Sequence, residues 1–303
     1  MPNYRWDVIY ESVQGASHKR TALPNQDAIT VFTDRHHLPV RMIVAVADGH
    51  GSPASFRSDR GADFAVKIAT DSLSHILEGM PGLPKSYTTL RRQIAEKLPR
   101  EIVYAWRKQV DEHLAGEPFM PAELEQLEIA SGEHKRRVVE SDPHIAYGTT
   151  LLAVLVTAGC IIYLQIGDGD IVTVSEAGEA SRPLPRDVRL IGNETTSLCS
   201  AEAWRHVSIH FQIIDEAQVD ASPPALILVS TDGYANAFRT DENFLMVGPD
   251  ILQMLKSASL EMVRKQLPDW LEEASALGSG DDITLGLLVR TDCLPATQET
   301  HQA

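Results

Sequence analysis

The chain has 303 residues, of which 43% are hydrophobic and 23% are charged, as is ordinary for a globular protein. Its net charge of −15 repels phosphate backbones, which excludes nucleic acid as an expected partner and leaves room for bound cations. The 3 cysteines are widely spaced, which favours neither a disulfide framework nor a zinc ribbon and indicates a reducing, cytoplasmic compartment. We expect neither a signal peptide nor a membrane partner, because no basic region precedes an apolar run and no apolar stretch is long enough to span a bilayer.

Short segments rich in Val, Ile and Thr predict a series of β-strands along the whole chain. They are Trp6–Ser12, Ala28–Thr33, Met42–Ala47, Thr149–Val156, Cys160–Ile166, Ile171–Ser175, Val207–Ile213, Leu226–Thr231 and Ile283–Val289. Several neighbouring segments are joined by only a few residues, which suits antiparallel hairpins and excludes parallel crossovers.

Helical spacing of apolar residues separates these groups of strands. It predicts helices over residues 59–78, 86–114 and 250–277, with Pro99 expected to kink or divide the second and Pro268 to break the third. Strand groups that alternate with long helices predict an α/β fold of the layered α+β kind, with mostly antiparallel sheets and helices on their outer faces.

Residues 115–144 mix proline, glycine and charge, and we expect them to form a surface excursion that is the least structured part of the chain. We expect residues 1–292 to form a single domain that includes this excursion. Residues 293–303 are expected to be a polar, frayed tail.

Acidic residues recur in glycine-containing turns at the ends of predicted strands. These residues are Asp27, Asp48, Asp168, Asp232, and the pair Asp281 and Asp282. Carboxylates held at strand ends suit hard cations such as Mg²⁺ and Mn²⁺, and glycine lets a backbone carbonyl approach as a further ligand. Any one of these turns is more often a plain Asp-Gly turn, and their spacing alone does not show that the carboxylates converge.

The motifs DGHGS, GTTLLAVLV, IGDGD, STDGYANAF and GSGDDIT occur in this order and resemble the metal-dependent type 2C (PPM-type) protein serine/threonine phosphatases. The resemblance extends over residues 12–289, and the opening GASHKRTALPNQDA is similar to a bacterial branch of the family. It implies a sandwich of two mostly antiparallel β-sheets flanked by α-helices. It also implies a binuclear Mn²⁺ or Mg²⁺ site at one edge, a phosphorylated protein as substrate and an opposing serine/threonine kinase.

The resemblance also implies roles for individual residues. Asp48 would bridge the two metal ions, and the carbonyl of Gly49 would bind one of them. Asp232 and Asp281 would bind the other ion. Asp27 would support the site through water, and Asp168 would bind a third, weaker ion. His50 would be the general acid that protonates the leaving oxygen, since an imidazole with a pKa near 6.5 can donate that proton. The alternative for His50 is a turn histidine paired with a carboxylate.

The chain departs from the family pattern at several positions. Gln26 stands where the family usually has Glu. The family's phosphate-binding arginine has no counterpart at the usual distance before this position, so we expect Arg20, ahead of His18 and Lys19, to bind the phosphate group. The usual GDSR is GDGD here, and the usual final DN is DD, in which Asp281 fits the ligand register better than Asp282.

Three functions are in competition. The first is a phosphatase that hydrolyses phosphoserine and phosphothreonine with a metal-activated water. The second is a regulatory or phosphoprotein-binding module of the same fold with weak catalysis, which Gln26 and the displaced arginine favour. The third is a two-metal hydrolase of small phosphorylated metabolites.

Overall fold

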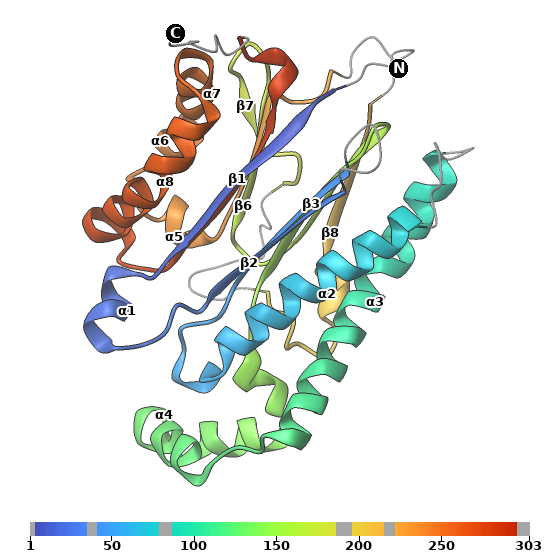
Figure 1. Ribbon diagram of the computed structural model, residues 1–303. Coiled ribbons are helices and arrows are strands. Elements are labelled where there is room, and N and C mark those ends of the chain that lie inside the picture. Colours follow the sequence, from blue (N-terminus) through green and yellow to red (C-terminus); the bar gives the residue numbers. More distant parts are fainter. Residues whose placement is uncertain (1–3, 35–40, 79–86, 186–195, 215–221, 296–303) are drawn as a thin grey trace, which may run out of the picture.

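The computed structural model describes residues 4–34, 41–78, 87–185, 196–214 and 222–295. They form two antiparallel five-stranded sheets that face each other, with helices outside both (Figure 1). The first sheet has the order β1 (Trp6–Val13), β10 (Ile283–Arg290), β9 (Leu226–Ser230), β6 (Asp170–Val174) and β7 (Ala180–Ser181). The second has the order β2 (Asp27–Asp34), β3 (Arg41–Asp48), β4 (Leu151–Val156), β5 (Cys160–Ile166) and β8 (Ser208–Ile213). The strands predicted from composition are all present, and the two-residue β7 is the one that was missed.

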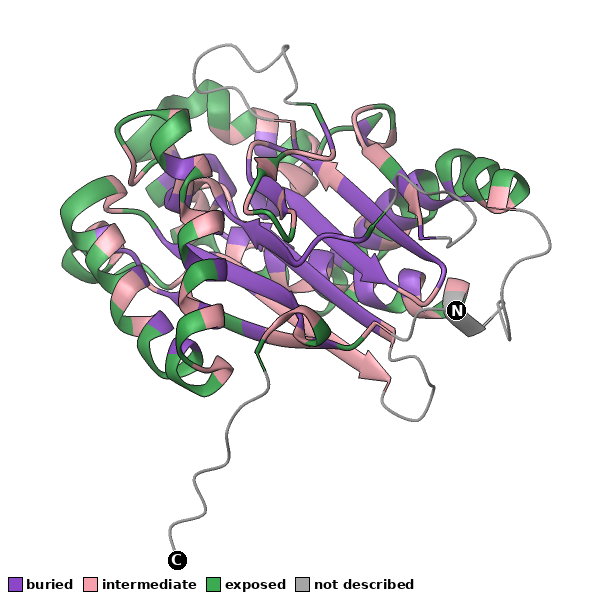
Figure 2. Cartoon of the chain, turned by 90° about the horizontal axis from the view of Figure 1, so that it is seen from above, coloured by how far each residue is buried: buried purple, intermediate pink, exposed green. Residues whose placement is uncertain are grey.

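Long amphipathic helices cover the outer face of each sheet. On the second sheet lie α2 (Ser58–Glu78) and α3 (Tyr87–Gly116); on the first lie α7 (Val247–Ser257) and α8 (Leu260–Ala274). The shorter helices are α1 (Ala16–Thr21), α5 (Asp232–Ala235) and α6 (Asp241–Leu245). In Figure 2 the central strands of the sheets are buried, the edge strands are largely intermediate, and the helices expose one side to solvent. This division follows from the helical period of their apolar residues.

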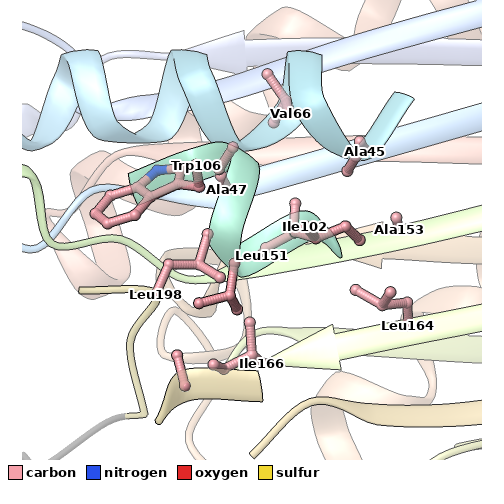
Figure 3. Packing of buried hydrophobic residues seen from close by; sticks show 14 of the residues in the cluster. Ala45, Ala47, Val66, Ile102, Trp106, Leu151, Ala153, Leu164, Ile166 and Leu198 are labelled. Atoms are coloured by element: carbon pink, nitrogen blue, oxygen red, sulfur yellow. The ribbon is translucent and has the colours of Figure 1, made fainter. Parts of the chain in front are cut away.

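The core has two layers on either side of β3, because both faces of this strand are covered. Its residues Met42, Val44 and Val46 pack between the sheets, whereas Ile43, Ala45 and Ala47 face α2 and α3. Figure 3 shows the second layer, where Trp106 of α3 lies among apolar side chains of the sheet. The buried indole nitrogen of Trp106 donates to the carbonyl oxygen of Gly61 at 2.9 Å, so the large ring leaves no unpaired donor.

The prediction that residues 115–144 are the least structured part of the chain is wrong, because helix α4 (Pro121–Ser141) occupies most of this stretch. Pro121 stands at its start, and the Glu123 carboxylate accepts from the backbone N–H of Met120 at 2.7 Å, which caps the first turn. Gly132 has φ of 83° and interrupts the helix, a backbone conformation that glycine adopts without strain.

Of the two predicted helix breaks, the one at Pro268 is wrong. At Pro99 the prediction was a kink or a division, and α3 continues through this residue without dividing. The third helical region is divided at Ala258 and Ser259, where the Ser259 hydroxyl caps α8, and not at Pro268, which lies inside that helix. Ser86 and the tail from residue 296 lie outside the described residues. Within the described part of the chain, no helix combines the length and apolarity needed to cross a membrane.

Candidate metal centre

The centre begins where β2 and β3 pair. In the antiparallel register Asp27 stands directly opposite Asp48. Burial raises the pKa of Asp27 well above its ordinary value, although a hydrogen bond of 2.8 Å from the Thr231 hydroxyl acts in the opposite direction. Burial also raises the pKa of Asp48, and the neighbouring charges of Asp27 and Asp232 raise it further. These carboxyl groups therefore meet in a space with little water to solvate their charge.

Three carboxyl groups from distant parts of the chain converge here. Asp48, at the end of β3, Asp168, after β5, and Asp232, at the start of α5, each offer an oxygen within 4.8 Å of the others. Burial raises the pKa of Asp232 to about 6, and the charges of Asp168 and Asp281 act in the same direction. The convergence that spacing alone left open is thus present for these residues.

Asp281 and Asp282 differ sharply in their surroundings. The buried Asp282 carboxylate accepts hydrogen bonds from the backbone N–H of Gly15 at 2.6 Å and of Gln26 at 2.7 Å, and it contacts His18 Nδ1 at 2.9 Å. Asp281 lies at the exposed rim, where partial desolvation raises the pKa of its carboxyl group. The Asp282 carboxylate is therefore occupied by hydrogen bonds within the protein. Asp281 forms a second cluster with Asp282 and His18, whose potential ligand atoms lie within 4.8 Å of one another, separate from the cluster of Asp48, Asp168 and Asp232.

The turn after Asp48 is built so tightly that only glycine fits at position 49. A Cβ on Gly49 would lie 2.6 Å from the carbonyl oxygen of Gln26 and 2.7 Å from that of Ser58. The next residue, His50, donates its backbone N–H to the carbonyl of Gly148 at 3.0 Å. Burial lowers the pKa of the His50 imidazole, while the charge of Asp168 acts to raise it. The ring therefore lies beside the carboxylate cluster.

Two threonines that the sequence reasoning did not assign fix the position of Asp48. Thr149 donates its hydroxyl to the Asp48 carbonyl at 2.8 Å, and Thr150 donates its backbone N–H to the same oxygen at 2.9 Å. The Thr150 hydroxyl in turn accepts from the Asp48 N–H at 3.0 Å. The GTT motif carried this signal, but its chemistry becomes visible only when β4 lies beside β3.

Gln26 lies in the wall of the centre and keeps one unpaired atom. Its side-chain nitrogen donates to the Ser58 hydroxyl at 2.8 Å, and its backbone carbonyl accepts from Gly49. Its side-chain oxygen is buried and has no hydrogen-bond partner among the described residues. This oxygen lies 3.8 Å from the place of a Cβ on Gly51, so it faces the turn that carries His50.

The basic residues considered for phosphate binding all lie on or near α1. His18 contacts Asp282, and Lys19 pairs with Glu272 at 3.1 Å. The exposed Arg20 donates from its guanidinium to the Ser17 hydroxyl at 3.0 Å. Arg20 thus makes its hydrogen bond within its own helix, and most of its donors face solvent.

The donor set suits a hard divalent cation. The converging side chains offer carboxylate oxygens, which Mg²⁺ and Mn²⁺ prefer, and the tight turn at Gly49 adds a nearby backbone carbonyl. Burial raises the pKa of both Asp48 and Asp232, and the charges of neighbouring aspartates raise it further, so a cation would relieve an unfavourable concentration of negative charge.

Comparison with known proteins points to one family. A family model described as protein phosphatase 2C matches residues 14–272. A solved bacterial serine phosphatase is 14% identical, with a TM-score of 0.57 and coverage of 94% of this chain and 98% of that chain. The catalytic domain of the serine/threonine phosphatase PstP, in complex with 2 manganese ions, is 17% identical, with a TM-score of 0.52 and coverage of 94% and 97%. Stp1 from Staphylococcus aureus is 14% identical, with a TM-score of 0.53 and coverage of 94% of each chain.

A sequence search of curated proteins found no significant match. At these low identities the solved structures establish the fold alone. The expected sandwich of two antiparallel sheets flanked by helices is confirmed.

Proposed function

We propose that this chain, which belongs to the protein phosphatase 2C family and is a protein serine/threonine phosphatase, uses a pair of metal ions. Its substrates in this proposal are phosphoserine and phosphothreonine, and the ions are Mn²⁺ or Mg²⁺. The family is metal-dependent and acts on phosphorylated proteins. The observation that carries the proposal is the convergence of Asp48, Asp168 and Asp232, with oxygens within 4.8 Å of one another.

In this proposal Asp48, the Gly49 carbonyl, Asp232 and Asp281 would hold the two ions, with Asp48 shared between them. Asp168 would hold a third, weaker ion. When bound, the cations supply hydroxide near neutral pH and neutralise the phosphate. The chain's own residues fix the backbone from which the carboxylates project, as Thr149 and Thr150 do for Asp48.

We assign the general acid to His50. Its backbone is fixed on the Gly148 carbonyl. Burial lowers the pKa of its imidazole, and the charge of Asp168 offsets part of this effect. From this position the ring donates its proton to the leaving serine or threonine oxygen, which would otherwise depart as a strong base. A Cβ on Gly148 would lie 2.6 Å from the His50 ring, so the absence of a side chain there leaves room for it.

The remaining assignments complete the active site. Asp27, held by the Thr231 hydroxyl, orients water next to Asp48. Arg20 binds the phosphate group through the donors that Ser17 leaves free. We infer that the enzyme opposes a serine/threonine kinase and acts in the cytoplasm, where the free cysteines Cys160, Cys199 and Cys293 stay reduced.

The test is hydrolysis of p-nitrophenyl phosphate and of a phosphoserine peptide, each with and without Mn²⁺. We expect metal-dependent turnover that Asp48→Asn nearly abolishes and that Asp269→Asn, the same change on the exposed side of α8, leaves unchanged. Equal rates in the native protein and in Asp48→Asn would contradict the proposal.

A second candidate function, a phosphoprotein-binding module with weak catalysis, is favoured by Gln26, whose amide adds no charge to the centre. Metal-independent phosphopeptide binding without turnover would support it. Turnover of small phosphorylated metabolites at rates above that of the phosphopeptide would instead indicate a metabolite hydrolase.

A further inference from the structure

An open groove of about 700 Å³ lies outside the metal centre, between α3 and the 3₁₀ turn at Ala203–Arg205. Its walls include Pro99, Arg100, Trp204 and Val207. A second hollow of about 340 Å³ adjoins it and shares Arg100 and Trp204 with the first. The second hollow also borders on Tyr104, whose side chain is 72% exposed. We call the two hollows together the Arg100–Trp204 groove.

Arg100 is held in an orientation that leaves its donors free. Its guanidinium lies 4.1 Å from the centre of the Trp204 ring, and that of Arg205 lies 5.0 Å from the same ring. Stacking uses the face of a guanidinium, whereas its five N–H donors lie in the plane and can still bind a carboxylate with two hydrogen bonds. Arg100 forms no ion pair or hydrogen bond with the part of the chain that the structure describes, so its donors have no partner there.

The groove has the opposite charge to the rest of the protein. It is lined by Arg100, Arg107 and Arg205 against the single carboxylate of Glu96, in a chain with a net charge of −15. Arg205 is in part neutralised by Glu202 at 2.8 Å. Arg107 is in part neutralised by Asp142 at 3.8 Å and donates to the carbonyl oxygen of Cys199 at 2.8 Å, so Arg100 is the lining cation that has no such partner among the described residues. A cationic, aromatic groove of this kind complements an acidic peptide segment. The net charge of −15 repels any anion, but a nucleic acid, which carries a charge on every nucleotide, is repelled along its whole length, whereas a peptide needs only one short acidic segment in the groove.

The groove is connected to the metal centre by a short segment of chain. The backbone N–H of Leu198 donates to the Thr149 carbonyl at 3.0 Å, and the Thr149 hydroxyl donates to the carbonyl of Asp48. Trp204 follows Leu198 by six residues in the sequence, a span of at most about 22 Å. A substrate whose phosphorylated side chain lies at Asp48 can therefore reach the groove with a short extended segment.

We propose that the Arg100–Trp204 groove docks an acidic segment of the phosphoprotein substrate, located about six to ten residues from the phosphorylated side chain. This rests on the proposed function for the identity of the substrate. The groove supplies the selectivity for acidic flanking sequence, and the metal centre supplies the reaction.

The binding test uses a fluorescein-labelled peptide with four consecutive glutamates and its glutamine counterpart, measured by anisotropy with the native protein. We expect the glutamate peptide to bind more tightly and to weaken with added salt. Arg100→Glu should weaken its binding by about five- to tenfold, since an attractive charge becomes a repulsive one. The matched control is Lys97→Glu, an exposed residue of the same helix that lines neither hollow; it should leave binding unchanged.

The kinetic test uses phosphoserine peptides with glutamates or glutamines at the stated separation. Arg100→Glu should raise KM for the glutamate peptide alone, with kcat and p-nitrophenyl phosphate hydrolysis unchanged. If the native protein hydrolyses neither substrate with Mn²⁺, the proposed function fails, while the anisotropy still decides the docking. Three results would overturn the groove as an acidic-peptide site. They are equal weakening of binding by Lys97→Glu, equal affinity for the glutamate and glutamine peptides, and displacement of the peptide by a single-stranded oligonucleotide that binds more tightly.

Discussion

Asp27 and Asp48 lie directly opposite each other on β2 and β3, so two carboxyl groups enter the metal centre from neighbouring strands. Burial raises the pKa of both. Ionisation of these groups therefore costs stability in the metal-free protein, a cost that the proposed cations would offset.

Replacement of one of these carboxyl groups should raise the stability of the metal-free protein and lower its metal-dependent activity. We expect Asp48→Asn to stabilise the metal-free protein by about 1 kcal/mol at pH 7, because it removes a buried like charge, while it abolishes metal-dependent turnover. Urea denaturation in EDTA and p-nitrophenyl phosphate hydrolysis in Mn²⁺ measure the two effects. A loss of stability in EDTA would show that the carboxylate repulsion is not significant.

The metal-free protein should become more stable as the pH falls from 7 towards 4. The pKa of Asp232 is raised to about 6 from an ordinary value of 3.8, so the folded state binds protons in this range that the unfolded chain does not. The stability gained is fully present below the ordinary pKa and is lost as the pH rises through the raised one. Denaturation at pH 5 and at pH 7 in EDTA checks the direction, and greater stability at pH 7 would contradict it.

Added metal should have the opposite dependence on pH. At pH 7, Mn²⁺ at a hundredfold excess over its Kd should stabilise the protein by about 2.7 kcal/mol, because the ion binds the folded state alone. At pH 5 the same concentration should stabilise it less, since protons compete for Asp48 and Asp232. Thermal melting at both pH values with and without Mn²⁺ measures the difference, for which Asp48→Asn is the control.

Gln26→Glu should increase the affinity for metal. The unpaired side-chain oxygen of Gln26 is buried next to the turn of Gly49–Gly51, so a carboxylate there adds a negative charge to the wall of the centre. We expect the Mn²⁺ concentration for half-maximal activity to fall severalfold and the stability in EDTA to decrease. Gln26→Leu, which lacks both polar atoms, is the control. An unchanged metal dependence in Gln26→Glu would mean that this position does not influence the ions.

Gly233 tests the close packing around the ligands. A Cβ there would lie 2.1 Å from the carbonyl oxygen of Asp282, so Gly233→Ala should destabilise the protein by more than about 2 kcal/mol. Gly116→Ala is the matched control, since no atom lies within 4 Å of its Cβ position. Urea denaturation of both variants provides the measurement, and a similar stability of the two would contradict the packing described here.

Helix α4 should depend on a single buried arginine. Arg57 donates to the Glu123 carboxylate from two nitrogens at 2.8 Å and also to the carbonyl oxygens of Glu117 and Pro118. We expect Arg57→Ala to cost about 3 kcal/mol and to expose α4 to proteolysis. Arg136→Ala, which removes an exposed cation with two glutamate partners on α4, should have little effect. Resistance of Arg57→Ala to proteases would show that α4 is held by other contacts.

The sequence predicted the sheets well and the 115–144 region poorly for a physical reason. The strands are encoded locally, since runs such as Met42–Ala47 are β-branched and apolar and are covered on both faces. Helix α4 is instead anchored by the hydrogen bond from Arg57 to Glu123 in its first turn. Arg57 lies more than sixty positions earlier in the chain, so no local sequence pattern predicts this contact. Pro268 likewise lies within α8, because the Ser259 cap determines where that helix starts.

The candidate site was predictable as a set of residues but not as a network. Ordered motifs indicated Asp48, Asp168 and Asp232, which the fold brings together. They did not indicate that the Asp282 carboxylate would accept hydrogen bonds from the backbone N–H groups of Gly15 and Gln26. Nor did they indicate that the Thr149 hydroxyl would donate to the Asp48 carbonyl. Those contacts join segments far apart in the chain, and their register depends on tertiary packing. The roles of His50 and Arg20 remain predictions.

The pairing of β1 with β10 has a consequence for biosynthesis. Trp6 stands opposite Arg290, and the Asp282 carboxylate just before β10 closes the loop after β1. A chain still emerging from the ribosome has most of its carboxylates but lacks the strand that fastens them. Assembly of the centre therefore depends on the pairing of β10 with β1, so a chain that has not been synthesised as far as Arg290 cannot yet hold these carboxylates in place.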